Sequence, residues 1–253
     1  MPIITDPVFY ALAIPAVTLL GISKGGFVGL GASAVPLLSL AIPPPQAAAL
    51  LLPILLAQDA VSVWIYHRDF SAWNLKVLLA GATLGMVIST FVSTSLSNDV
   101  VKLAVGVIAV LFVATRIAAP WIEHHLPKPS VASGVFWGVL AGFASAIANA
   151  GSPPYQIHML PQRLPKMTFV GTTALYFAAT NVMKIPSYAF LGQITWVNMS
   201  TGIALIPLAV ATNFIGVYLV RRVSMEAFYR IAYVLFFVLG CELIRSAGLA
   251  LWR

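Results

Sequence analysis

Charged residues are scarce in this chain: Lys, Arg, Asp and Glu make up 8% of its 253 residues, and only seven of them are acidic. A soluble globular domain carries roughly 25% charged residues, so an ordinary water-soluble fold is excluded. Hydrophobic residues reach 60%, and the mean hydropathy is +0.95. The sequence therefore predicts an integral membrane protein that crosses the bilayer several times.

Cysteine is almost absent as well, because Cys241 stands alone. A single cysteine excludes an internal disulfide and a cysteine metal cluster. The four histidines (His67, His124, His125 and His158) show no metal-ligand spacing. We therefore expect no metal and no cofactor. The few acidic residues and the missing Ser-His-Asp pattern also argue against an enzyme. Basic cytoplasmic loops explain the net charge of +7 better than nucleic acid does, so we expect no nucleic-acid partner.

Long apolar stretches are what the chain does contain. Six of them have about 20 residues, which is enough to cross a hydrocarbon core of roughly 30 Å as a helix. They lie at 46–66, 75–95, 100–119, 167–190, 198–220 and 226–250. Two further regions, 8–41 and 132–163, are interrupted by Gly, Pro or polar residues. We expect the first to split at Lys24–Gly31 into arms of about 15 and 10 to 14 residues, roughly 20 Å long and too short to cross. The second should split at 149–156, with an outgoing arm that is shorter still.

The two halves of the chain resemble each other on either side of the linker PWIEHHLPKPS at 120–130. Aligning SKGGFVGLGASAVP with ANAGSPPYQIHMLP sets Gly26 opposite Gly151, and further on Trp73 matches Trp196. Duplication explains these matches better than chance similarity between apolar segments, which stays the alternative.

The basic residues favour one topology. If each interrupted region crosses the membrane once, Lys and Arg divide evenly between the two faces. If each instead enters and leaves on the same side, nine share one face and three lie opposite, as the positive-inside rule requires. The nine are Arg68, Lys76, Arg116, Lys128, Arg163, Lys166, Arg221, Arg222 and Arg230, and the three are Lys102, Arg245 and Arg253.

We therefore expect an all-α integral membrane protein made of two inverted repeats, each a re-entrant or broken helical hairpin plus three transmembrane helices. Residues 1–119 form the first membrane repeat, 120–131 a cytoplasmic linker and 132–253 the second repeat. In this topology both termini face the periplasm, and residues 67–74 face the cytoplasm.

Four glycines (Gly25, Gly26, Gly29 and Gly31) open the first hairpin in an apolar setting. Each costs a helix about 1 kcal/mol relative to alanine, and exposed backbone at membrane depth is tolerated only inside protein or beside a wet cavity. We interpret the break as the tip of a binding loop whose N–H groups face a ligand. Close helix packing is the alternative.

Both hairpins supply candidate substrate-binding residues. The set is Lys24, Gly25, Gly26, Ser33, Asn149, Gly151, Ser152, Tyr155 and Gln156. Lys24 either attracts an anion directly or pairs with Asp59, an acid in the middle of an apolar stretch. Asp59 could alternatively carry a coupling proton. Gln58, Asn181 and Lys184 lie at matching depths and join Asp59 as ion-pair or coupling candidates.

Inverted repeats with broken helices are typical of secondary transporters, and the motifs are similar to those of one family. GISKGGFVGLGASAVPLLSL and GVLAGFASAIANAGSPPYQIHML, with the segments that follow them, resemble the sulfite exporter TauE/SafE family over nearly the whole chain. The resemblance implies a bacterial inner-membrane permease, an exporter rather than an importer, for sulfite, sulfoacetate or other organosulfonates. The second motif departs from the family pattern at 149–154, which leaves the substrate open.

We expect a small sulfonate or sulfite anion and the lipid bilayer as partners, with a homodimer left open. Two other classes of function remain as alternatives. A membrane-embedded enzyme would form a measurable product, and a non-transporting scaffold subunit would bind no anion.

Overall fold

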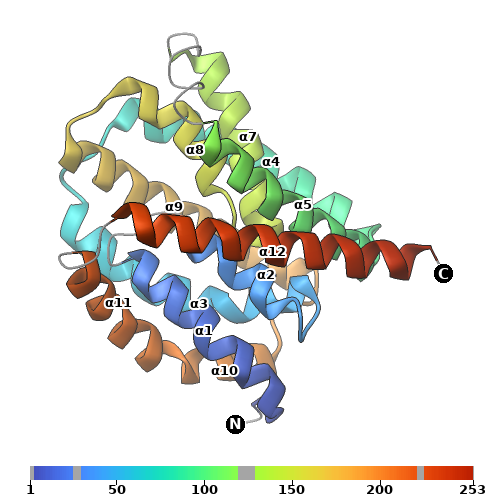
Figure 1. The fold of residues 1–253 in the computed structure, drawn as a ribbon. Helices are drawn as coiled ribbons and strands as arrows, with labels where there is room; N and C mark the ends of the chain where they lie inside the picture. The colour runs from blue at the N-terminus through green and yellow to red at the C-terminus, as the bar shows by residue number, and fades with distance from the viewer. Residues whose placement is uncertain (1–2, 25–29, 119–128, 221–224, 253) are drawn as a thin grey trace.

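The computed structural model describes residues 3–24, 30–118, 129–220 and 225–252, and within these ranges every regular element is a helix. Helices are expected because a chain surrounded by hydrocarbon must satisfy its backbone N–H and C=O groups internally. Figure 1 shows the helices gathered into one bundle. In chain order they are α1 (Pro7–Lys24), η1 (Leu30–Ser33), α2 (Ala34–Leu38), α3 (Pro44–Tyr66), α4 (Ala72–Thr94), α5 (Asn98–Ile117), α7 (Val131–Ala148), α8 (Ser152–Met159), η2 (Leu160–Gln162), α9 (Lys166–Phe190), α10 (Trp196–Ala204), α11 (Ile206–Val220) and α12 (Met225–Leu251).

The uninterrupted apolar stretches are confirmed as the helices α3, α4, α5, α9 and α12, with ends that differ from the prediction by at most three residues. Local chemistry sets several of these ends. The Ser71 hydroxyl accepts the N–H of Asn74 at the start of α4, and the Ser97 hydroxyl accepts the N–H of Val100 at the start of α5. Both serines are N-caps, which satisfy donors that the first turn of a helix leaves open.

The stretch at 198–220 is the exception, because two helices, α10 and α11, replace one and meet at a bend of 41°. Pro207 explains the break. It has no N–H to donate to the carbonyl of Ile203, and its ring crowds that carbonyl.

The two interrupted regions form hairpins that return to the end of the bundle where they began. In the first, the N–H of Ile4 donates to the Thr201 hydroxyl (3.1 Å), and Gln46 reaches Asn198 one turn away on α10 (3.1 Å). In the second, Ser133 near the start of α7 lies 3.4 Å from His158 near the end of α8.

The expected length of the first arm of the first hairpin, about 15 residues, was wrong. Helices α1 and α7 each have 18 residues, about 27 Å of helix. They are long and apolar enough to cross a membrane, as are α3 and α4, and α10 with α11 if that bent pair is one span. The helices run on through Gly21 and Gly142 because these glycines lie against Ala209 of α11 and Ala82 of α4, where tight packing offsets the propensity cost.

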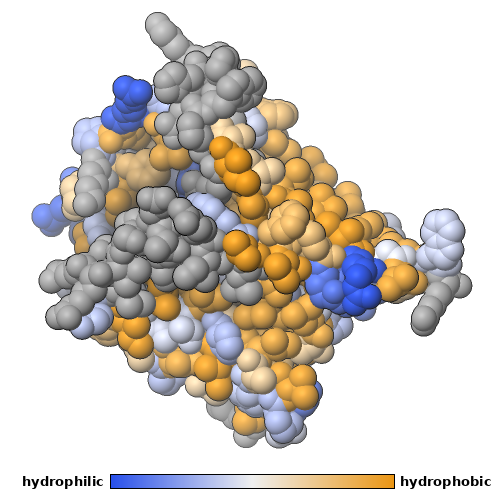
Figure 2. Space-filling view, viewed as in Figure 1, coloured by the Kyte–Doolittle hydropathy of each residue, from blue (hydrophilic) through white to orange (hydrophobic). Residues whose placement is uncertain are grey.

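Apolar side chains cover much of the outside of this bundle, as Figure 2 shows in orange on the viewed face. Large hydrophobic residues that are at least half exposed include Trp64, Phe91, Leu111 and Phe214. Exposed apolar surface of this extent is stable in lipid rather than in water. Together with the candidate spans it identifies a multi-pass membrane protein.

Helix pairs tie the two halves together. Helix α4 packs on α7, α1 on α11, α5 on α12 and α3 on α9. Three of these interfaces contain glycines at which no Cβ would fit: Gly81 and Gly85 face the α7 backbone, Gly21 faces Ala209, and Gly106 faces Gly240. Gly81 and Gly85 therefore allow α4 and α7 to pack closely.

The bundle has two ends, separated by the 25 residues of α9, about 37 Å of helix. At one end the N–H of Ser71 donates to the Thr172 hydroxyl, so the α3–α4 loop lies on the start of α9. We call this the 71/172 end. At the other, Gln46 meets Asn198 and the N-terminal segment joins α10. We call this the 46/198 end.

We predict that Gly85→Ala destabilises the fold by about 1–3 kcal/mol, because the added methyl overpacks the α4–α7 contact. Its Cβ would lie 2.8 Å from the Val139 carbonyl carbon and 2.9 Å from the Phe143 amide nitrogen. Thermal unfolding in detergent measures the effect. Gly248→Ala, where nothing lies within 4 Å, is the control. Equal unfolding temperatures for the two variants would contradict the tight contact.

We also predict that a cysteine at Asp69, in the 71/172 end, reacts only with cytoplasmic reagent, and one at Gly192, in the 46/198 end, only with periplasmic reagent. The uneven distribution of basic residues is the reason. The experiment uses a Cys241→Ser background and membrane-impermeant maleimide on cells and on inverted vesicles. Labelling of both positions from the same side would rule out this orientation.

Candidate functional site

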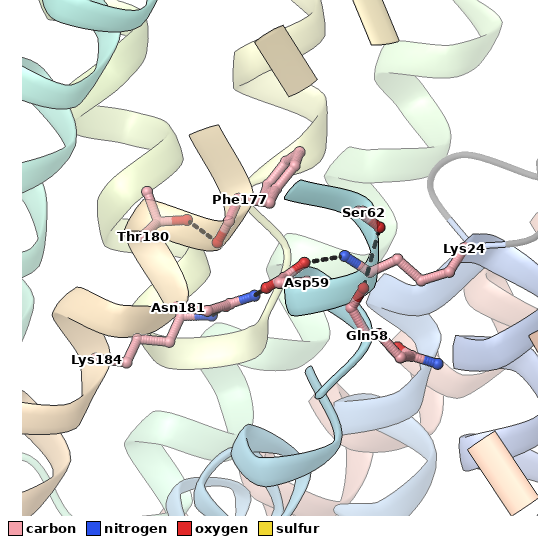
Figure 3. A network of polar contacts seen from close by, with 8 residues as sticks. All are labelled: Lys24, Gln58, Asp59, Ser62, Phe177, Thr180, Asn181 and Lys184. Atoms are coloured by element: carbon pink, nitrogen blue, oxygen red, sulfur yellow. Dashed lines mark hydrogen bonds and ion pairs between the residues drawn. The ribbon is translucent and has the colours of Figure 1, made fainter. Parts of the chain in front are cut away.

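The centre of the bundle holds a chain of ionised and amide side chains, which we call the central network. Asp59 of α3 is its middle member. Its Oδ1 accepts a hydrogen bond from the Lys24 ammonium (2.5 Å), and its Oδ2 accepts one from the Nδ2 of Asn181 on α9 (2.5 Å). Figure 3 shows the carboxylate between Lys24 on one side and Asn181 on the other. The side chain of Asp59 is 3% exposed and that of Lys24 22%. Of the two roles predicted for Lys24, the pairing with Asp59 is therefore confirmed.

Asn181 extends the network to a second lysine. The Lys184 ammonium donates to Asn181 Oδ1 (2.8 Å) and to Asn149 Oδ1 (2.6 Å), and Lys184 is only 1% exposed. Because an ammonium can only donate and a carboxylate can only accept, both ends of the Asn181 amide have fixed orientations. The same logic fixes Asn149, whose oxygen must face Lys184.

Asn149 owes its position to the end of α7. It is the C-cap of that helix, with a left-handed backbone (φ 52°, ψ 25°), a conformation that asparagine tolerates better than most residues. The turn aims the amide at α9. Lys24 likewise ends α1, so the central network joins the first arms of both hairpins to the helix pair α3–α9.

The two halves contribute to this network in the same register. Lys24 and Asp59 are 35 residues apart, and so are Asn149 and Lys184. In the first half the cation is on the hairpin and its partner on the long helix; in the second half the cation is on the long helix. The alignment of Gly26 with Gly151 already implies these equivalences, so the pairing of Lys184 with Asn149 could have been found in the sequence.

Two buried amides beside the network lack partners among the described residues. Gln58 is 3% exposed, yet neither its Nε2 nor its Oε1 has a hydrogen bond. In Figure 3 its side chain turns away from Asn181. The Nδ2 of Asn149 is also buried and unpaired. A buried polar group without a partner costs about 1–3 kcal/mol, so these amides are candidates for binding a ligand or water.

The remaining candidates have other surroundings. Ser33 is buried at the start of α2. Gly151 packs against Ala141 and Ser145 of α7. Gly25 and Gly26 lie outside the described residues, and so does most of the predicted glycine tip.

Three polar residues of α8 bond within the protein. Gln156 donates to the Ser152 hydroxyl (2.6 Å), and the hydroxyls of Tyr155 and Thr173 share a hydrogen bond (2.9 Å). The first turn of α8 also contains Pro153 and Pro154, which have no N–H to offer an anion. The arrangement therefore leaves more of any anion binding to side chains than the sequence suggested.

A cavity of about 830 Å³ opens at the 46/198 end, and the sequence did not predict it. Its lining is uncharged and mixed, with polar residues (Gln46, Asn98, Gln193 and Asn198 among them) beside apolar ones such as Leu96 and Phe190. Beyond it, sharing Gln193, lies a void of about 10 Å³ lined by Ser89, Ala146, Ile147, Ser187 and Tyr188. That void has room for about one water molecule.

Amides close the 71/172 end. Asn74 and Gln162 exchange two hydrogen bonds (2.9 and 2.8 Å), and His158 adds a third to Asn74 (3.2 Å). His158 also stacks on Trp73. His158 thus fills space in this cluster and is hydrogen-bonded within it.

Within the described ranges no cluster of His, Cys, Asp or Glu could hold a metal ion. What the site does offer is buried positive charge and unused amide donors inside a multi-pass helical bundle. Ionisable residues at such depth mark substrate or ion pathways in membrane proteins, so the fold and site define a membrane protein of the transporter type.

The model of the Sulfite exporter TauE/SafE family matches residues 13–243, nearly the whole chain, and the chain belongs to this family. Comparison with curated proteins and with solved structures gave no match.

We predict strong coupling between Lys24 and Asp59. Asp59→Asn should cost about 3 kcal/mol of stability, since it leaves a largely buried cation without its counter-ion. Lys24→Gln should destabilise as well. The double variant should be about 1–3 kcal/mol more stable than the sum of the single effects, because it removes both charges together. Unfolding in detergent measures the cycle.

Asp69→Asn, at an exposed aspartate of the α3–α4 loop, controls for the chemical change. If the two single effects simply added up, the ion pair between Lys24 and Asp59 would contribute no coupling free energy, and the prediction would be wrong.

Proposed function

We propose that the protein is a secondary transporter that exports small sulfur-containing anions such as sulfite, sulfoacetate or other organosulfonates. The observation that carries the proposal is the central network. It contains two ammonium groups and one carboxylate, flanked by the unpaired amides of Gln58 and Asn149. A net positive charge with spare donors suits an oxyanion, and the family membership supports a sulfur-containing one. Import is the less favoured direction.

We propose alternating access around this network. The pairing of α4 with α7 and of α1 with α11 is what two structurally equivalent halves in opposite orientation would produce. The helices at the centre, α3 and α9, are the equivalent members of the two halves and pair with each other. This supports the inverted-repeat organisation and a site where the repeats meet.

The two ends of the bundle differ in a way that fits one state of such a cycle. The 46/198 end contains the large cavity, whereas the 71/172 end is held by Asn74, Gln162 and His158. In the opposite state this amide cluster would separate and the cavity would close. On the predicted topology the carrier lies in the inner membrane with periplasmic termini, so the cavity faces the periplasm.

An enzyme is the weaker alternative, because the central network contains neither a nucleophile with a base nor a metal ligand set. A scaffold subunit would have no need for two buried lysines that share one acid. Binding and transport measurements separate these classes. Purified protein should be stabilised by sulfonates, and proteoliposomes should exchange labelled sulfonate in counterflow.

We predict that Gln58→Met separates ligand binding from stability. Removing an unpaired buried amide should stabilise the protein by about 1–3 kcal/mol, while the rise in unfolding temperature caused by isethionate, taurine, sulfoacetate or sulfite should shrink. In the parent a ligand at 100 times its Kd stabilises by about 2.7 kcal/mol.

Gln156→Met is the matched control. Its amide is also buried but bonds to Ser152, so this variant should lose stability. If Gln58→Met lost stability and kept the full response to anions, Gln58 would be a structural residue and the site would lie elsewhere. If no anion stabilised the parent and no exchange occurred, the transporter proposal would be wrong.

A further inference from the structure

We propose that Lys184 and Asn149 form the subsite that binds the substrate's negative charge, and that among the proposed substrates they favour singly charged ions, such as hydrogensulfite and simple sulfonates, over the doubly charged sulfoacetate. This inference rests on the proposed function and assigns the charge selectivity of that same site. The two cations of the central network have different partners. Lys24 has a carboxylate, and Lys184 has two amide oxygens.

Burial makes that difference consequential. Lys184 is 1% exposed and forms no ion pair with any described residue. A buried ammonium is normally paired with an opposite charge. The Asp59 carboxylate is separated from Lys184 by the Asn181 amide and already bonds to Lys24. With both lysines protonated, the network as a whole lacks one negative charge, and that deficit lies at Lys184.

The register of the two halves identifies where the missing charge would belong. In the first half, Lys24 at the end of α1 pairs with Asp59 of α3. In the second half, Asn149 at the end of α7 takes the corresponding position beside Lys184 of α9, where an acid would complete an ion pair. An acid at position 149 would make two matched ion pairs and a neutral network. Asn149 instead supplies only an amide oxygen to Lys184 and keeps an unused Nδ2 donor. Lysine and amide donors side by side suit a sulfonate oxygen, because hydrogen bonds to an ionised group are the strong ones.

The large cavity gives the anion a route to this subsite. The small void that shares Gln193 with it is lined by Ala146 and Ile147, which lie three and two residues before Asn149, and by Ser187 and Tyr188, one turn beyond Lys184 on α9. The Tyr188 hydroxyl donates to the Ala146 carbonyl at 2.7 Å.

A deficit of one charge also sets the class of ligand. A singly charged sulfonate neutralises the network, whereas a doubly charged oxyanion of the same tetrahedral shape leaves a surplus negative charge in a dry interior. The parent should therefore bind isethionate at least about tenfold more tightly than sulfate at equal ionic strength.

The test uses the purified full-length chain in detergent, with Kd for isethionate and sulfate from isothermal calorimetry. Asn149→Asp places a permanent carboxylate beside Lys184. It should fold with an unfolding temperature at or above that of the parent and lose isethionate binding by about 100-fold. Asn149→Ala, the matched control, removes one donor without adding charge and should lose only about tenfold.

Lys184→Met provides the second variant, since it removes the cation, keeps the bulk and leaves the Lys24–Asp59 pair neutral. It too should abolish binding while folding. Parent-like isethionate binding by Asn149→Asp or by Lys184→Met overturns the subsite, and so does sulfate binding as tight as isethionate binding in the parent. These outcomes require a parent that binds, so they are distinct from failure of the transporter proposal, in which the parent binds no anion.

Discussion

The carboxylate of Asp59 is the group on which the centre of this protein depends. It is one of seven acidic residues in the chain, and it lies buried inside the helical bundle. An isolated charge would be very costly there. Two partners hold it, the Lys24 ammonium and the Asn181 amide. Since those partners come from α1 and α9, one side chain connects a hairpin of the first half to a long helix of the second. The positions of both hairpin arms relative to α3 and α9 follow from this single buried charge and its bonds.

Close contacts between glycines and the backbone of a neighbouring helix join much of the rest of the bundle. Gly85 faces Val139 and Phe143, and Gly21 faces Ala209, so the helices approach closely without side chains between them. In lipid, where the hydrophobic effect does not drive helices together, close van der Waals contact takes its place. The bundle thus combines tightly packed helix pairs with a polar centre. In the proposed alternating access, the helix pairs would keep their packing and the contacts of the polar centre would rearrange.

Hydropathy predicted the long helices well, because twenty apolar residues in a membrane have few alternatives. It underestimated α1, which continues through Gly21 because that glycine packs against Ala209 of α11, a contact that only the folded structure displays. The pair of Lys24 with Asp59 was foreseeable, as two opposite charges in apolar segments need each other. The unpaired state of Gln58 and the neutral cavity near Gln193 were not, because both depend on side-chain directions that no spacing rule specifies.

The bend at Pro207 makes the two halves mechanically unlike. Helix α4 runs unbroken, while its counterpart in the second half is two helices joined at Leu205, with the Ile203 carbonyl released from its usual donor. In a carrier of two equivalent halves, perfect symmetry would give the inward-facing and outward-facing forms the same energy. On the proposed alternating-access cycle, a hinge in one half would remove that degeneracy, and the empty carrier would then rest facing one side. Such a bias determines which conformation the empty carrier prefers. It does not determine the direction of net flux, which for a passive carrier follows the concentration gradient alone.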